Sequence, residues 1–396
     1  MLKSVTRPCP ICDNPTGEIL HTQRFVLPEG HPQTTAYDVV CCIKCGFVYA
    51  DTSSSQKDYN EYYSKLSIYA DNQTSTSLGT SQCVTERMQR VALAVAHVIP
   101  NKHARIVDIG CVHGGLLRDL HNLGYTNLCG IDLDSSCVAQ TAQVPGVDAY
   151  IGSLSQIPAE AGPFDCLTSS YVFEHLRDLQ PALIYLKQFL KPNACIYLEV
   201  PDATRYADFM FAPFQDFNTE HINHFSMISM ANLLHKCGFT LISSDTTEIL
   251  LAPDKPFPAL YVFATPSTST PSMQKDEGLK AHIIDYIAIS RQMMNEFDER
   301  LQLVLAQTPE VLVWGTGQLT LKLLAETSLA NAKIVAFVDS NTIFQGMLLR
   351  GSPILAPSKV KPSTTPIIVA STLHYEDICK SIHQYGLTNP IISLRG

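Results

Sequence analysis

Short apolar runs alternate with helical patterns through the middle of the chain. Five such runs predict buried strands, at residues 105–109, 127–131, 148–151, 164–169 and 194–199. Between them, apolar residues recur at helical spacing, as at Leu116, Leu117 and Leu120. Strands that alternate with helices predict an α/β fold with a doubly wound, Rossmann-like parallel sheet. Ligands of such sheets bind at the carboxyl ends of the strands.

A similar pattern returns near the end of the chain. A Ser/Thr/Pro-rich linker at 264–272 precedes a predicted long helix, 274–307, whose apolar residues have the spacing of a packed face. Val311-Leu312-Val313-Trp314-Gly315-Thr316-Gly317 then predicts a strand and a glycine turn, and a second strand ends at Asp339. The order indicates a second Rossmann-like domain.

The N-terminal segment carries two C-x-x-C pairs, Cys9/Cys12 and Cys42/Cys45. Two such knuckles can place four thiolates around one zinc ion, and the spacing favours Cys42 over Cys41 as the ligand. A disulfide pair or a redox site is the alternative. The segment is rich in proline and has little core of its own, so a structural zinc ion would supply folding energy.

These patterns divide the chain into three parts. We expect a zinc-binding segment and connector at 1–70, a central domain at 71–264, and a long helix with the second Rossmann-like domain at 265–396. The tyrosine-rich connector, residues 58–69, either forms an aromatic wall over a ligand or packs a helix against the central domain.

Composition limits the partners. The net charge is −9 with 28 Lys and Arg, which argues against nucleic acid and anionic membranes as main partners. No apolar run approaches the length of a membrane span, and the start of the chain lacks an apolar signal region. These features predict a cytoplasmic protein with a small-molecule ligand.

The first strand of the middle region leads into the most informative stretch. Asp108 lies near the end of this strand, and Gly110, Gly114 and Gly115 follow it. Glycines let the backbone turn tightly and approach a ligand closely, and the helix that follows presents its N-terminus to an anion. Asp132 ends the next strand, where a carboxylate can accept hydrogen bonds from ribose hydroxyls. A nucleoside site is therefore predicted here rather than a bare structural turn.

Further motifs follow in the chain. Gly152-Ser153-Leu154 closes the third strand, where a backbone amide or Ser153 can read an adenine edge. Glu174-His175-Leu176 lies beyond the fourth strand, and Leu190-Lys191-Pro192-Asn193 predicts a helix-stop turn before the fifth.

In this order, the motifs from about Arg87 to Gly238 resemble those of a class I S-adenosylmethionine (SAM) methyltransferase. A nicotinamide dehydrogenase shares the glycine turn and the ribose acid but not the last two motifs. The resemblance implies SAM as cofactor. The residues expected to hold it are Asp108, Gly110, Cys111, Gly114, Asp132, Ser153, Leu154 and Ser170. Val112 stands where these enzymes often have a second glycine.

Outside the cofactor motifs, the richest candidate site is the stretch from Asn218 to Ser226, which contains Glu220-His221 and His224. An imidazole that titrates near neutrality suits proton abstraction, and a neighbouring Glu can fix its orientation or raise its basicity. We therefore expect His221 to act as a base or substrate contact. The alternative is a helix N-terminus with Ser226 as cap and His224 as a packed residue.

The order of zinc segment, methyltransferase core and Rossmann-like domain resembles nucleotide-sugar C-methyltransferases, which make branched deoxysugars. The resemblance implies that His221, with Glu220, is the base and that His175 is a second catalytic histidine. It also implies that the C-terminal domain helps to hold the nucleotide-sugar, through Gly315 and Gly317, unless that turn is a relic of the fold. Further substrate contacts are expected from Tyr69, Asn218 and His224.

The expected chemistry starts from a 4-keto sugar, whose neighbouring carbon carries an acidified proton. His221 would remove this proton, and the resulting carbanion would accept the methyl group. O-methylation of a hydroxyl would use the same histidine and stays open as an alternative. So does a binding protein that keeps the fold without catalysis.

Overall fold

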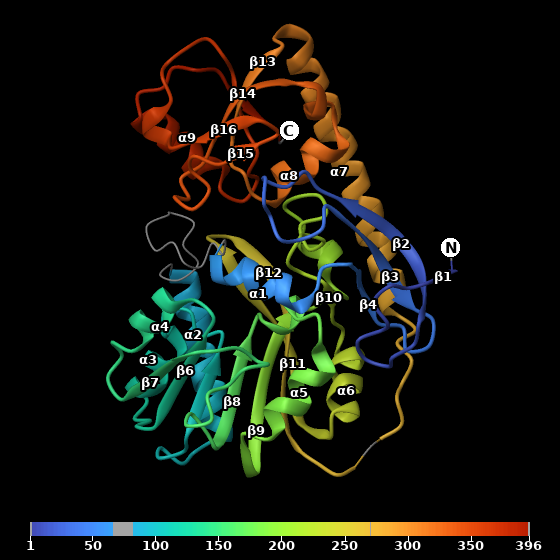
Figure 1. Ribbon diagram of the computed structural model, residues 1–396, viewed down its shortest axis with the longest axis vertical. Helices are drawn as coiled ribbons and strands as arrows, with labels where there is room; N and C mark the ends of the chain where they lie inside the picture. The colour runs from blue at the N-terminus through green and yellow to red at the C-terminus, as the bar shows by residue number, and fades with distance from the viewer. Residues whose placement is uncertain (1, 66–81, 270, 395–396) are drawn as a thin grey trace.

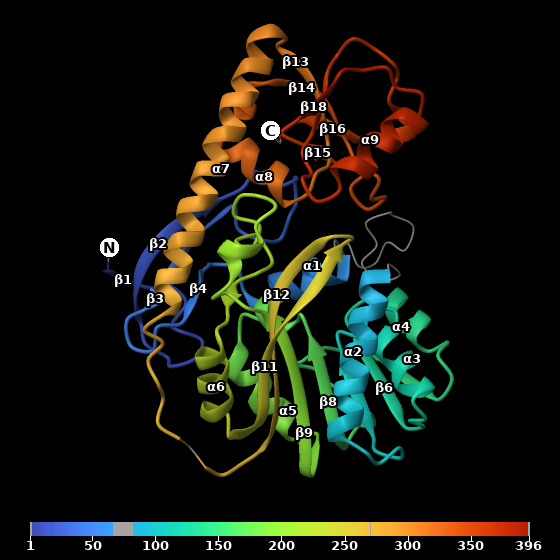
Figure 2. The same ribbon diagram turned by 180° about the vertical axis from the view of Figure 1, so that it is seen from behind.

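The computed structural model describes residues 2–65, 82–269 and 271–394, which form three sheets with their helices. The central unit and the C-terminal unit lie at opposite ends of the molecule, and the N-terminal sheet lies beside both (Figures 1 and 2). Tyr69, an expected substrate contact, falls outside the described residues.

The central sheet has seven strands in the order β11-β12-β9-β8-β5-β6-β7. The strands that the apolar runs predicted are parallel neighbours. Their bounds are β5 (Ile106–Ile109), β6 (Leu128–Asp132), β7 (Val147–Ile151), β8 (Phe164–Ser170) and β9 (Leu190–Pro201). Every residue of β5 is buried, because it lies at the centre of a sheet that is covered on both faces.

The remaining two strands form an antiparallel hairpin, β11 (Phe239–Ala252) and β12 (Lys255–Pro266), at the β9 edge. The central sheet is therefore mixed and not wholly parallel as predicted. The middle of β11, residues 243–246, is exposed and polar, so the strand contains no long apolar run that would predict it.

The Leu-Lys-Pro-Asn stretch also differs from expectation. Strand β9 already begins at Leu190, and Asn193 adopts a positive φ of 63°. The pairing shifts there, from Phe164 opposite Leu190 to Cys166 opposite Cys195. The predicted turn is thus an irregularity within the strand.

Helices cover both faces of the central sheet (Figure 1). They are α2 (Gln82–Val98), α3 (Gly115–Asn122), α4 (Ser135–Thr141), α5 (Leu179–Lys187) and α6 (Met227–Lys236). The predicted cap is confirmed at α6, where Ser226 Oγ accepts from the Ser229 amide at 3.0 Å in a capping box.

The N-terminal sheet has the order β1-β2-β3-β4-β10 and is antiparallel wherever its strands pair. Its first four strands are β1 (Leu2–Ser4), β2 (Thr16–Arg24), β3 (Ala36–Cys42) and β4 (Val48–Asp51), and α1 (Gln56–Lys65) follows them. The fifth strand, β10 (Asn223–His224), comes from the central part of the chain and pairs with β4. The segment that carries the cysteines is therefore bonded directly to the segment that carries His221.

The C-terminal unit is an α/β sheet domain that begins with the long helix α7 (Leu279–Gln307). Buried residues of α7, including Leu279, Ile283 and Tyr286, share one apolar core with the N-terminal sheet and the C-terminal sheet. The sheet order is β15-β16-β14-β13-β17-β18. Its elements are β13 (Glu310–Trp314), α8 (Gln318–Glu326), β14 (Lys333–Val338), β15 (Leu348–Leu349), β16 (Ser352–Leu355), β17 (Ile367–Val369), α9 (Tyr375–Gln384) and β18 (Ile391–Ser393). As in the central unit, a strand, glycine turn and helix recur, here at β13 and α8.

Among the helices that the structure describes, none combines the length and the apolar character that a bilayer crossing requires.

Candidate functional site

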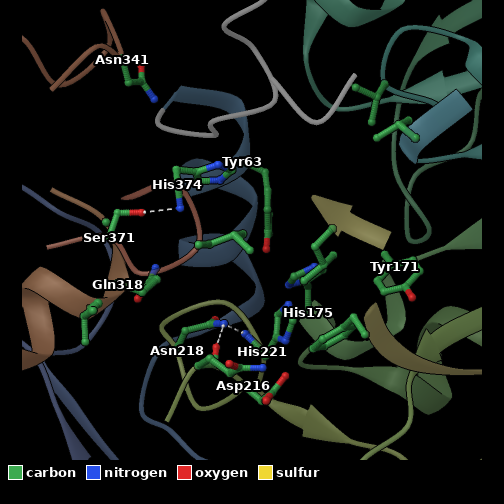
Figure 3. Close-up of a pocket in the computed structure, with 18 of the residues that line it drawn as sticks. Tyr63, Tyr171, His175, Asp216, Asn218, His221, Gln318, Asn341, Ser371 and His374 are labelled. Atoms are coloured by element: carbon green, nitrogen blue, oxygen red, sulfur yellow. Dashed lines mark hydrogen bonds between the residues drawn. The ribbon is translucent and has the colours of Figure 1, made fainter. Parts of the chain in front are cut away.

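A cavity of about 840 Å³ lies between the carboxyl ends of the central strands and the C-terminal sheet. Its walls come from the glycine turn after β5, the ends of β6 to β8, helix α1, the loop before β10 and the turn after β13. Figure 3 shows His175 and His221 together on one wall, with Tyr63 nearby and with Gln318, Ser371 and His374 contributed by the C-terminal unit. One cavity therefore joins the two predicted ligand-binding turns.

Gly110, in the turn after β5, lines this cavity. Its φ is 79°, and a Cβ there would lie 2.7 Å from Cγ2 of Val172. Only glycine fits without displacement of a neighbour. Asp108, two residues earlier in β5, accepts a hydrogen bond from Thr168 Oγ1 at 2.8 Å, and burial raises its pKa to about 7.

Asp132 ends β6 in the position expected of a ribose acid. Its Oδ2 accepts from the Val112 amide at 3.0 Å, and its Oδ1 accepts from the Asp134 amide at 3.0 Å. Burial raises the pKa of Asp132. Val112 adopts a φ of 47°, so the residue that replaces the second glycine keeps the left-handed backbone that glycine favours.

The remaining predicted cofactor residues divide into two groups. Cys111, Ser153, Leu154 and Ser170 line the cavity. The Ser153 amide is not available to read an adenine edge, because it donates to the Gln156 carbonyl at 2.9 Å. Gly114 does not line the cavity; a Cβ there would lie 3.1 Å from Thr141 Oγ1, so this glycine allows α3 to pack closely.

His175 and His221 lie together although they are far apart in the chain. The His175 ring Nδ1 donates to the backbone carbonyl of Glu220, 45 positions later. Their ring centroids are 4.9 Å apart with an interplanar angle of 67°. Burial lowers the pKa of His175 to about 4 and that of His221 well below the ordinary value. Both rings are therefore neutral near pH 7, the state that a general base requires.

The orientation of Glu220 corrects the expectation that this residue positions His221. Glu220 accepts hydrogen bonds from the hydroxyl groups of Tyr62 at 3.0 Å and Tyr63 at 3.2 Å, and Gln318 Nε2 lies 3.5 Å from it. Adjacency in sequence therefore does not bring the Glu220 carboxyl group to the His221 ring. Its carboxyl group instead joins α1 to the start of α8.

Two expected substrate contacts are also corrected. Asn218 lines the cavity, but its Oδ1 accepts from the amides of Glu220 and His221, both at 2.8 Å, and its Nδ2 donates to the Gln215 carbonyl. The amide therefore shapes the loop. His224 does not line the cavity: it is fully buried, packs against Phe217 at 4.7 Å between ring centroids, and pairs with β4.

Several groups in and around the cavity were not predicted. Tyr171, at a φ of 58°, lies under the guanidinium group of Arg87, 4.8 Å from its ring centroid. Asp216 lines the cavity and is buried, which raises its pKa to about 7. Glu174 lies beside the two histidines. Glu174 belongs to a motif visible in the sequence, but the other positions carry no local signal.

The C-terminal wall contains both predicted glycines, Gly315 and Gly317. Asp339, at the acidic strand end, accepts from the Thr316 amide at 2.8 Å and from Thr316 Oγ1 at 2.5 Å. The Asp339 carboxylate is thus hydrogen-bonded within its own turn. Asn341, Ser371 and His374 supply the further polar side chains of this wall (Figure 3).

The four predicted cysteine ligands, Cys9, Cys12, Cys42 and Cys45, come together as one buried cluster, with Sγ atoms within 4.8 Å of one another. Cys9 and Cys45 are 3.5 Å apart, and Cys12 and Cys42 are 3.4 Å apart. Tetrahedral zinc with Zn–S bonds of about 2.3 Å separates sulfur atoms by about 3.8 Å, so the cluster is compatible with zinc. Cys41 lies outside it, with its Sγ 3.5 Å from the Gly46 carbonyl.

Arg7 connects the cysteine segment to both histidine loops. Its buried guanidinium group donates to the carbonyl groups of Leu176 and Ile222, each at 3.2 Å, and to Asn223 Oδ1 at 2.9 Å. Leu176 directly follows His175, and Ile222 directly follows His221. One side chain therefore fixes the spacing of the two loops.

Comparison with known families assigns two parts of the chain. Residues 84–244 match a family described as a methyltransferase domain, and residues 307–392 match one described as C2185-like, N-terminal. The first match covers the glycine turn, Asp132, His175 and His221. Residues 84–244 therefore form a methyltransferase domain, which agrees with the predicted fold of this part of the chain.

Relatives with a curated sequence are distant. An uncharacterized 37.1 kDa protein in a transposon of Streptomyces fradiae is 29% identical over 105 residues, 24% of this chain and 30% of the relative. An uncharacterized methyltransferase of Oceanobacillus iheyensis is 26% identical over 106 residues, 26% of this chain and 49% of the relative. The chain thus spans less than half the length of either relative.

Solved structures with a similar fold include the magnesium protoporphyrin IX methyltransferase of Synechocystis with bound SAH. It is 15% identical, with a TM-score of 0.43, over 54% of this chain and 100% of that one. A SAM-dependent methyltransferase from Mesorhizobium loti is 18% identical, with a TM-score of 0.35, over 43% and 95%. Similarities this distant do not indicate a substrate.

Proposed function

We propose that this protein transfers a methyl group from SAM to a nucleotide-activated keto-deoxysugar, at the carbon next to the ketone. The observation that carries the proposal is the shared cavity. The glycine turn after β5, the neutral His175–His221 pair and the glycine turn after β13 all open into it.

The residues around the first turn fit SAM. Gly110 leaves room for a close approach, Asp132 presents a carboxylate at the end of β6, and Ser170 has a buried hydroxyl without a hydrogen-bond partner among the described residues. Asp132 would hold the ribose hydroxyls, and Ser153 and Leu154 would border the adenine. When bound, SAM supplies an electrophilic methyl group on a sulfonium.

The histidine pair supplies the base. His221 lines the cavity and is neutral, so it can take a proton from the carbon beside a ketone. His175 is fixed by the Glu220 carbonyl and lies against Tyr63, at 5.5 Å between ring centroids. The loop contacts of Asn218 and Arg7 hold both rings in place, which favours proton transfer through orientation.

The C-terminal wall would receive the nucleotide part of the substrate. Gly317 begins α8 without a side-chain cap, so the first amides of this helix are available to a phosphate group. Asn341, Ser371 and His374 provide hydrogen-bonding groups beyond it. This role rests on the resemblance to nucleotide-sugar C-methyltransferases and on the continuity of the cavity.

We also propose that Cys9, Cys12, Cys42 and Cys45 hold a structural zinc ion. Four buried thiols leave no open coordination position for catalysis. The metal would stabilise the segment that carries Arg7.

The test is to incubate the full chain with SAM and a 4-keto nucleotide-sugar and to examine the product by mass spectrometry and NMR. We expect a product with one additional methyl group and a new carbon–methyl signal. An oxygen–methyl signal would establish the O-methyltransferase alternative. SAM binding by calorimetry without turnover of any sugar would refute the substrate assignment, and absence of SAM binding would refute the enzyme.

A further inference from the structure

Glu174 is buried deep behind the histidine pair. Its side chain is 1% exposed, and neither carboxyl oxygen has a hydrogen-bond partner among the residues that the structure describes. An unpaired buried carboxylate is costly, so such a group is retained where something compensates it during function. Its neighbours on the cavity side are His175 and His221.

The three side chains bring ring nitrogens and carboxyl oxygens close together. His175 Nδ1 lies 3.1 Å from the Glu220 carbonyl, which can only accept, and the Tyr171 carbonyl is a second acceptor for the same ring. A ring with two acceptors is stabilised when it carries a second proton, and its Nε2 lies 3.8 Å from Glu174 Oε1. One atom each of Glu174, His175 and His221 lies within 4.8 Å of the other two, and His221 Nδ1 is buried without a partner in the described chain. A shared cation would relieve this arrangement.

We propose that Glu174, and not Glu220, is the positioning residue of the histidine pair, and that Glu174, His175 and His221 bind one proton as a unit. This inference rests on the proposed function. Without that proton, the unit is a carboxylate facing two neutral rings, which makes His221 a stronger base than burial alone would allow. With it, the unit is inactive.

The surroundings favour a proton over a metal ion. Arg87 from α2 faces Glu174 with a positive charge, while Glu199 from β9 faces it with a negative charge, and Tyr171 and Tyr206 complete the polar neighbours. A nearby guanidinium disfavours a divalent ion.

The proton balance is simple. The C–H bond beside the ketone breaks, its electron pair stays on the sugar as an enolate, and the proton passes to His221. Glu174 then forms an ion pair with the charged ring. After the methyl group has been transferred, the unit returns its proton to water. Burial raises the pKa of Glu174 to about 8, so the unit is proton-bound below that pH.

The experiment compares wild type, Glu174→Gln, Glu174→Asp and Glu220→Gln. For wild type, we expect kcat to rise with pH through an apparent pKa near 8. In Glu174→Gln this rise of kcat with pH, the limb of the pH profile, should disappear or move well below pH 7. The value of kcat should fall about 10- to 100-fold with little change in KM. Glu174→Asp should restore part of the limb. Glu220→Gln is the matched control, in which the limb should stay.

A second measurement does not depend on turnover. In nitrogen-15 NMR of labelled histidine, the His175 and His221 signals of wild type should change near pH 8, and those of Glu174→Gln should not. SAM binding shows whether each variant is folded. An unaltered limb or unaltered histidine titration in Glu174→Gln would overturn the proposal. The proposal would also be overturned if wild type bound a second metal ion, in addition to the one at the four cysteines, and Glu174→Gln did not bind it. Failure of every keto-sugar would refute the proposed function while the NMR result still decides the role of Glu174.

Discussion

The guanidinium group of Arg7 donates to the carbonyl of Ile222 at 3.2 Å, so a residue two positions before the first cysteine holds the residue that follows His221. The same group reaches Leu176, which follows His175. The distance between the two imidazoles is thus set from the N-terminal segment. This segment is a structural part of the candidate active site.

Replacement of Arg7 tests this role. Arg7→Lys keeps a positive charge but loses the planar fork of donors, so buried carbonyl groups lose partners at about 1–3 kcal/mol each. We expect unfolding at lower denaturant concentration and a kcat reduced at least about tenfold. Arg24→Lys, the same substitution at an exposed arginine of the same segment, is the control and should change little. Equal effects of both variants would show that Arg7 has no special role.

Removal of the metal should have a related effect. A strong chelator should unfold the cysteine segment and abolish methyl transfer, and added zinc should restore both. Circular dichroism and activity are the measurements. Cys42→Ser should mimic the chelator, whereas Cys41→Ser should not, because Cys41 neighbours the cluster without belonging to it. A fully active metal-free protein would contradict the prediction.

Cofactor affinity should depend on Asp132. Asp132→Ala removes the carboxylate expected to bind ribose, and a hydrogen bond to a charged group contributes about 1.5–3 kcal/mol. The Kd for SAM, measured by calorimetry, should therefore rise about 10- to 100-fold. Asp134→Asn is the control: Asp134 caps α4, and Asn caps a helix equally well. A Kd that is unchanged in Asp132→Ala would remove this residue from the cofactor site.

Val112 offers a test of backbone strain. A β-branched residue at a φ of 47° costs about 1–3 kcal/mol, and glycine removes that cost while adding about 0.5–1 kcal/mol of backbone entropy. We expect Val112→Gly to stabilise the protein by about 1 kcal/mol in denaturant titrations. Gly110→Ala should do the reverse and weaken SAM binding, because its Cβ would meet Val172. Destabilisation by Val112→Gly would mean that packing of the valine outweighs strain.

Stability should fall as the pH rises from about 6.5 to 8. Asp108, Asp216 and Glu174 have pKa values raised to about 7, 7 and 8, so stability present in their protonated state below about pH 4 is lost as the pH rises toward 8. Buried histidines act in the opposite sense: His175 and His224, with lowered pKa values, lose stability as the pH falls below 6.5. The two contributions oppose each other between about pH 4 and 6.5, and only that of the carboxyl groups remains above it, where thermal unfolding should show it. In Glu174→Gln the alkaline slope should be shallower.

Local patterns predicted the strand–turn–helix–strand unit around Gly110 well. The strands β5 and β6, the turn at Gly110 and the acid Asp132 lie within about 25 residues, and apolar runs and glycines mark each of them in the sequence. The long helix and the glycine turn at Gly315 could also be predicted, because apolar spacing and glycines mark them in the sequence. The capping box at Ser226 is also a short-range feature.

The candidate substrate site was predicted less well because its contacts are distant in sequence. Glu220 accepts hydrogen bonds from Tyr62 and Tyr63 of α1, and the Glu-His sequence does not predict those partners. His224 is drawn into a strand pair with β4, a contact across about 175 residues that turns its ring into the core. Chain neighbours indicate which residues are near a site, but the fold decides which way each one points.

The pairing of β10 with β4 has a consequence for synthesis on the ribosome. When residues 1–51 have emerged, the outer edge of β4 still lacks its partner, because Asn223 and His224 have not yet been made. An open strand edge invites association with other chains. We expect the nascent N-terminal segment to depend on chaperones, or on early metal capture, until translation has passed the second histidine loop.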